Sequence, residues 1–189
     1  MIRIGERLAT SAMAGDRDEQ RMITAAAALI LFPALMAFSA FADLLTMTIP
    51  NRVSLALIGL FAVFAASLGM TLDSVLWHVA CGAAVLVATF LMFNRGWMGG
   101  GDAKLASATA LWLGFDQLAD YALVASLVGG ALTLVILALR HYEPRFVSRS
   151  PRFAHLCDGT EGVPYGIALA IAGIVAYPNS QIWALLTAA

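Results

Sequence analysis

The sequence predicts an all-α integral membrane protein, a polytopic helical bundle with about six transmembrane helices. The composition and the lengths of the uncharged runs carry this prediction. Of the 189 residues, 61% are hydrophobic and 12% are charged, which is about half of the ~25% charge of an ordinary soluble domain. The mean hydropathy is +0.84. Because a compact core of this size could not shield so many apolar residues from water, lipid is the expected solvent for most of the chain.

Six apolar runs account for the predicted helices, since a helix needs about 20 residues to cross the bilayer core. Five are long, and the last of them is interrupted by Pro178-Asn179. The sixth has only 13 residues, so the sequence leaves open whether it spans fully. The long runs are residues 22–42, 53–70, 75–93, 121–139 and 164–186, and the short run is 103–115.

Residues 1–21 are expected to form a polar N-terminal tail ahead of a membrane-embedded domain at 22–189. The tail mixes both charge signs and has no apolar segment typical of a cleavable signal peptide. The formal net charge of −1 argues against a nucleic-acid partner, because no basic domain could neutralise phosphates. The two cysteines, Cys81 and Cys157, form no CxxC pair, so the sequence predicts neither a metal site nor a disulfide framework.

The distribution of Lys and Arg predicts the orientation in the membrane. If all six runs cross, four arginines of the tail face seven basic residues on the other side, which is then cytoplasmic. If the run 103–115 does not cross, the basic residues from Arg140 onward move to the side of the tail, and the predicted orientation inverts. The seven are Arg52, Arg95, Lys104, Arg140, Arg145, Arg149 and Arg152.

Two aspartates are the candidate functional residues, because charges at membrane depth are costly. Asp43 ends the first run and is followed by Ile49-Pro50-Asn51, where proline breaks one helix and opens the next. Asp102 follows three consecutive glycines, which allow backbone conformations and close approaches that are closed to other residues. Both aspartates fall on the same membrane face whether or not the short run crosses.

Two carboxylates at the edge of a low-dielectric layer cannot both ionise easily, so the pair can share one proton. One carboxylate can then activate water while the other protonates a leaving group. This chemistry requires no cofactor and no metal. The sequence also fits simpler roles, in which Asp43 is an interfacial cap and Asp102 is a helix N-cap. Two other classes of function stay open, namely a small transporter or channel subunit with a proton or cation relay, and a membrane scaffold.

Two further groups of residues are expected to be structural. His78, inside the third run, is expected to be a packed, hydrogen-bonded side chain and not a ligand. The tryptophans fall near the ends of runs, as an aromatic belt would place them; they are Trp77, Trp97, Trp112 and Trp183.

Three blocks of this sequence, in order, resemble those of the prepilin peptidase family of GxGD-type intramembrane aspartic proteases. The first is Asp43 with the corner that follows it, the second is GGGDAKL at 99–105, and the third opens the final run. Presenilin-like proteases share GxGD, but their other motifs are not found here. The third block is Pro164-Tyr165-Gly166.

The resemblance implies an inner-membrane aspartic endopeptidase that removes the leader of prepilins and pseudopilins at the cytoplasmic face. Its partners would be these substrates, membrane lipid, and the pilus assembly or secretion machinery. It implies that Asp43 and Asp102 are the catalytic pair, and that Lys104 either pairs with them or reaches the membrane interface. The residues expected to shape the site are Gly99, Gly101, Lys104, Pro50, Asn51, Pro164, Tyr165 and Gly166.

Long members of the family carry a cytoplasmic segment with two CxxC pairs, associated with metal binding and N-methylation of the product. This chain has neither pair and is similar to the short branch that serves tight-adherence (Flp-type) pili. It departs from that branch between Asp43 and the Ile49-Pro50-Asn51 corner, where Leu-Leu-Thr-Met-Thr stands in place of the family's frequent basic residues.

Overall fold

The computed structural model describes residue 23, residues 26–142 and residues 162–187, and these residues form helices and no strands. The predicted tail and most of the polar connection after Arg140 lie outside them. The helices are Ala26–Thr46, α2 (Asn51–Ser67), α3 (Leu72–Asn94), α4 (Gly100–Tyr142), α7 (Gly166–Ala176) and α8 (Gln181–Thr187), with the 3₁₀ turn Tyr177–Asn179 between the last two.

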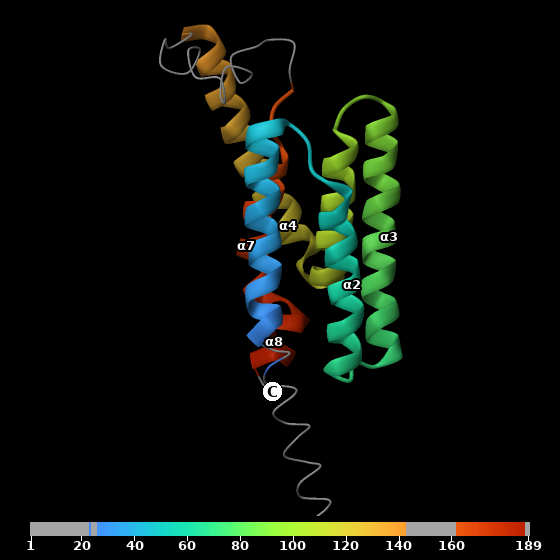
Figure 1. The fold of residues 1–189 in the computed structure, drawn as a ribbon. Coiled ribbons are helices and arrows are strands. Elements are labelled where there is room, and N and C mark those ends of the chain that lie inside the picture. Colours follow the sequence, from blue (N-terminus) through green and yellow to red (C-terminus); the bar gives the residue numbers. More distant parts are fainter. Residues whose placement is uncertain (1–22, 24–25, 143–161, 188–189) are drawn as a thin grey trace, which may run out of the picture.

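The helices form the polytopic membrane bundle that the composition predicts (Figure 1). Among the described residues, three segments are long and apolar enough to cross a membrane, namely Ala26–Thr46, Leu72–Asn94 and Phe115–Tyr142. A fourth is possible if the pair formed by Gly166–Asn179 and Gln181–Thr187, bent by 53°, is one span. Helix α2 is apolar but shorter, with 17 residues.

Helix α4 is broken at Gly114, so the short run 103–115 is the first half of a bent element. Gly114 has φ 71° and ψ 178°, a conformation open to glycine and closed to other residues. Figure 1 shows α4 descending from the upper end of the bundle and then returning to that end. Arg140 donates to the Gly162 carbonyl at 2.8 Å. Gly162 lines the same cleft as Asp102, so Arg140 lies at the same end of the bundle as Asp102, as expected if run 103–115 carries the chain away from that end.

His78 holds the break in place from α3. Its Nδ1 donates to the Leu111 carbonyl at 2.8 Å, and its Nε2 lies 3.2 Å from Gln181 Oε1. Leu111 is in the last turn of the half-helix, where carbonyl groups have no partner within the helix. A β-carbon at Gly114 would lie 3.1 Å from His78 Cε1. The expectation that His78 is a packed, hydrogen-bonded residue is confirmed.

Helix α7 runs alongside the first helix for its whole length. Its contacts follow one face: Gly166 meets Asp43, Gly173 meets Met36, and Tyr177 at its end stacks on Phe32 with ring centroids 4.3 Å apart. Small residues on this face let the two backbones approach closely, which is how helices pack in lipid.

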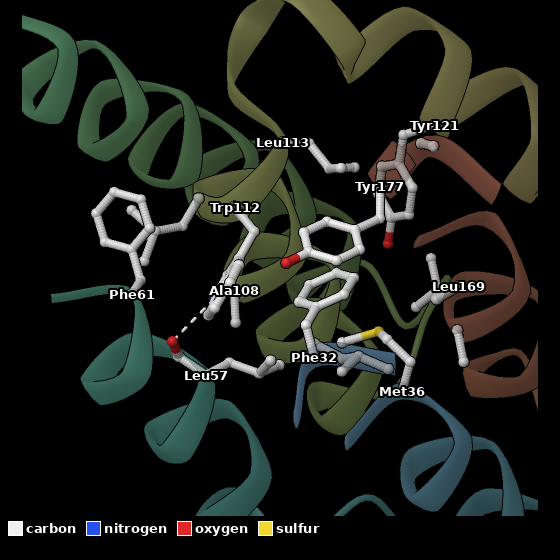
Figure 2. Packing of buried hydrophobic residues seen from close by; sticks show 14 of the residues in the cluster. Phe32, Met36, Leu57, Phe61, Ala108, Trp112, Leu113, Tyr121, Leu169 and Tyr177 are labelled. Atoms are coloured by element: carbon white, nitrogen blue, oxygen red, sulfur yellow. Dashed lines mark hydrogen bonds between the residues drawn. The ribbon is translucent and has the colours of Figure 1, made fainter. Parts of the chain in front are cut away.

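The core centres on Trp112, which has no exposed surface (Figure 2). Its Nε1 donates to the Leu57 carbonyl of α2 at 2.9 Å. The first helix and α2 surround the indole with aromatic rings, as Phe32 and Phe64 have centroids 5.0 and 5.7 Å away. The prediction that Trp112 belongs to an interfacial belt is therefore wrong. The run it ends stops inside the bundle at Gly114, and this was not visible from hydropathy.

The upper end of the bundle gathers three segments that are far apart in the sequence (Figure 1). The first helix ends there at Thr46, α4 begins there at Gly100, and α7 begins there at Gly166. These are the three blocks that the sequence singles out.

We predict that Trp112→Ala destabilises the fold by about 3–5 kcal/mol, because it removes a fully packed indole and its hydrogen bond to the Leu57 carbonyl. Thermal unfolding in detergent measures the effect. Trp97→Ala is the matched control, since Trp97 is 68% exposed. Equal melting temperatures of the two variants would contradict a core centred on Trp112.

Candidate active site

Asp43 lies in the last turn of the first helix, with 5% of its surface exposed. Its Oδ2 accepts a hydrogen bond of 2.7 Å from the backbone N–H of Gly166. Gly166 is the first residue of α7, and the first N–H groups of a helix have no partner within it. The carboxylate is thus bound at a helix N-terminus, where the helix dipole favours negative charge.

Asp102 is the third residue of α4, and its carboxylate reaches back to accept a hydrogen bond from the backbone N–H of Gly99. This is the reach-back geometry of a capping box, so Asp102 caps α4 from within its first turn and does not precede the helix. Ile49 contacts both Gly101, the residue before Asp102, and Gly166, which binds Asp43, so the two aspartates lie on neighbouring segments. The structure thus brings the two predicted aspartates together, each at the N-terminus of a helix.

Ile49 packs between the two segments that hold the aspartates. A β-carbon at Gly101 would lie 3.2 Å from Ile49 Cβ and 3.3 Å from its backbone N. A β-carbon at Gly166 would lie 2.7 Å from Ile49 Cδ1 and 2.8 Å from Asp43 Oδ2. Any larger residue at either glycine would push the corner or the carboxylate away. The close approach that Gly101 allows in this structure is that of Ile49.

The turn before this corner is made without glycine. The first helix ends at Thr46, and Met47 adopts φ 52° while its N–H donates to the Asp43 carbonyl at 2.9 Å. This left-handed residue is a helix C-terminal stop that glycine usually provides. Pro50 then flanks α2 as its N-cap residue, with φ −62° and ψ 134°, one position earlier than the first-turn position expected for proline.

Lys104 lies on the exposed side of α4, and its Nζ donates to Asn51 Oδ1 at 2.8 Å. Asn51 is the first residue of α2. The described contact of Lys104 is therefore with the corner and not with the carboxylates. It links the start of α4 to the start of α2 beside the site.

The third block anchors the site from the other side. Pro164 is fully buried, and the Tyr165 hydroxyl donates to the Ala125 carbonyl at 3.1 Å.

Gly99, predicted to allow close approach, is approached by the Asp102 carboxylate, since a β-carbon there would lie 3.1 Å from Oδ2.

A cleft of about 550 Å³ opens beside Asp102, within the size range of ligand-binding pockets. Asp102, Thr133 and Tyr165 are its polar side chains. The others come mainly from the end of α3 and the loop that follows it, and are largely apolar; they are Met92, Gly96, Trp97, Met98, Gly99, Gly162 and Val163. Sequence reasoning missed Met92 and Thr133, because nothing in a helical run marks the side that faces a cleft.

The described residues contain no group of three or more His, Cys, Asp or Glu side chains that could hold a metal ion. The described site consists of two carboxylates bound by backbone N–H groups, beside a mostly apolar cleft. The fold and site define a polytopic membrane protein with an acidic pair at one end of its bundle.

Comparisons with known proteins place this chain in a family. Residues 30–134, which include both aspartates, match the type IV leader peptidase family. The chain is 31% identical over 156 residues to the prepilin leader peptidase/N-methyltransferase of Aeromonas hydrophila and to that of Aeromonas salmonicida strain A449. These alignments cover 79% of this chain and 48% of each relative, so the chain spans about half the length of the curated relatives it matches. No solved structure matches it. The chain belongs to the type IV leader peptidase family.

We predict that Asp43→Asn leaves the melting temperature in detergent close to that of the wild type, because an amide oxygen can still accept from the Gly166 N–H. Asp43→Ala leaves this buried N–H unpaired and is expected to cost about 1–3 kcal/mol. Thermal unfolding of the two variants side by side measures the difference. An alanine variant as stable as the asparagine variant would show that this hydrogen bond does not hold the first helix to α7.

Proposed function

We propose that this protein is a membrane-embedded aspartic endopeptidase that cleaves the leader peptide from type IV prepilins and pseudopilins. The observation that carries the proposal is the juxtaposition of Asp43 and Asp102, with Asp102 lining the cleft. Membership of the type IV leader peptidase family supports the same chemistry.

The two carboxylates would hydrolyse a peptide bond with water as the nucleophile. The ionised carboxylate takes a proton from water while the water oxygen attacks the scissile carbonyl carbon. The protonated carboxyl group donates its proton to the carbonyl oxygen. Collapse of the tetrahedral intermediate breaks the C–N bond, and the proton taken from water goes to the departing amine. The Gly166 and Gly99 N–H groups would fix the carboxylates in place without taking part in proton transfer.

The cleft fits an extended peptide segment that leaves the membrane. Its wall combines the flexible apolar side chains Met92 and Met98 with Trp97 and the polar side chains of Asp102, Thr133 and Tyr165. The site lies at one end of an apolar bundle, so a substrate helix held in lipid would bring its emerging end to the level of the carboxylates. The balance of basic residues supports an orientation with this end cytoplasmic, and membership of the family supports an inner-membrane location.

We further propose that the substrates are Flp-type prepilins and that the activity is the endopeptidase one alone. The resemblance to the short branch supports both points, since neither Cys81 nor Cys157 belongs to a CxxC pair. The proposed reaction uses no cofactor, and the pilus assembly or secretion machinery would receive the product.

Co-expression in bacterial membranes with a Flp-type prepilin tests the proposal. We predict that the wild type converts the prepilin to a faster-migrating product, and that Asp43→Asn and Asp102→Asn each abolish conversion at equal expression. Asp73→Asn is the matched control, because Asp73 is exposed in the first turn of α3, at the far end of the bundle.

Cleavage that survives in either active-site variant would contradict the carboxylate pair. A well-expressed wild type that cleaves no leader would contradict the peptidase proposal. An activity that depends on an ion gradient would then favour the transporter alternative.

A further inference from the structure

The aromatic ring of Tyr165 lies directly against the backbone of Gly129, in the second half of α4. A β-carbon at position 129 would lie 2.5 Å from Tyr165 Cζ and 2.6 Å from its hydroxyl oxygen, closer than real side chains approach. The Tyr165 hydroxyl also donates to the Ala125 carbonyl, one turn earlier on the same helix. The ring therefore lies along α4 from Ala125 to Gly129, and only glycine leaves space for it.

We propose that Gly129 is a positioning residue for the carboxylate pair, acting through Tyr165 and Gly166. This inference rests on the proposed function. Tyr165 is bonded to Gly166, whose N–H binds Asp43 at 2.7 Å. The ring position fixed at Gly129 thus sets where this N–H points.

The residues that connect Gly129 to Asp43 are closely packed, so a shift of the Tyr165 ring cannot be absorbed between them. Gly166 is buried, and a β-carbon on it would already lie 2.8 Å from Asp43 Oδ2 and 2.7 Å from Ile49 Cδ1. Tyr165 also lines the cleft with Asp102. A displaced ring would therefore alter the cleft wall and the hydrogen bond on Asp43 together.

The neighbouring Gly130 provides a matched control within the same helix. A β-carbon at Gly130 would meet nothing within 4 Å. Alanine is the better helix former, so Gly130→Ala is expected to be neutral or slightly stabilising. The same substitution at Gly129 adds the same helix propensity, and any loss must come from the contact with Tyr165.

The test measures cleavage kinetics and thermal unfolding of the full chain in detergent for Gly129→Ala, Gly130→Ala, Tyr165→Leu and the Gly129→Ala/Tyr165→Leu double variant. We expect Gly129→Ala to lower kcat about 10²-fold, the effect of a displacement of roughly 1 Å at a catalytic group. Gly130→Ala should match the wild type. Because leucine removes the ring, Gly129→Ala should cause no further loss of kcat or melting temperature in the Tyr165→Leu background.

Two results would overturn the inference. Wild-type kcat in Gly129→Ala is one. The other is an equal loss from Gly129→Ala with and without the tyrosine ring, which would mean that the glycine serves some other packing need. If the wild type and Gly130→Ala cleave no prepilin, the proposed function fails. The melting temperatures of the four variants then decide whether Tyr165 is the residue that requires glycine at 129.

Discussion

The close approach of Ile49 to the backbones of two glycines at the upper end of the bundle is the constraint on which the site depends. Ile49 fits between Gly101 and Gly166 because neither has a side chain. This contact fixes the corner after the first helix against the helix of Asp102 and the start of α7. Close packing of this kind is needed to place the two helices that carry the aspartates, since lipid provides no hydrophobic force to press helices together.

Asp43 is buried and Asp102 is half-buried, and each carboxylate is bound at the N-terminus of a helix. Asp43 binds the first N–H of α7, and Asp102 binds the N–H of Gly99 just before α4. Unpaired charges away from water would cost several kcal/mol. The helix ends supply N–H donors that need acceptors. The hydrogen bond on Asp43 joins the first helix to α7, while that on Asp102 is local to the start of α4, and Ile49 provides the packing between the two segments.

The break in α4, inside the bundle, sets the depth of Asp102. The half-helix that begins at Gly100 stops at Gly114, and His78 holds its last turn through the Leu111 carbonyl. Trp112, in that last turn, is fully buried against the first helix and α2. The half-helix is thus fixed at its inner end, so the position of its outer end, with Asp102, follows from its length.

The fold class and the helical runs could be predicted from the sequence, and the two aspartates could be singled out as candidates, because hydropathy and the cost of charge in lipid are local properties. The sequence also predicted the packed role of His78. Tertiary structure alone decided that the short run is half of a bent helix, that Trp112 is core, and that Lys104 binds Asn51. It alone decided that Gly129 faces Tyr165 while Gly130 faces open space. Adjacent glycines look alike in a sequence, and only the packing of distant segments distinguishes them.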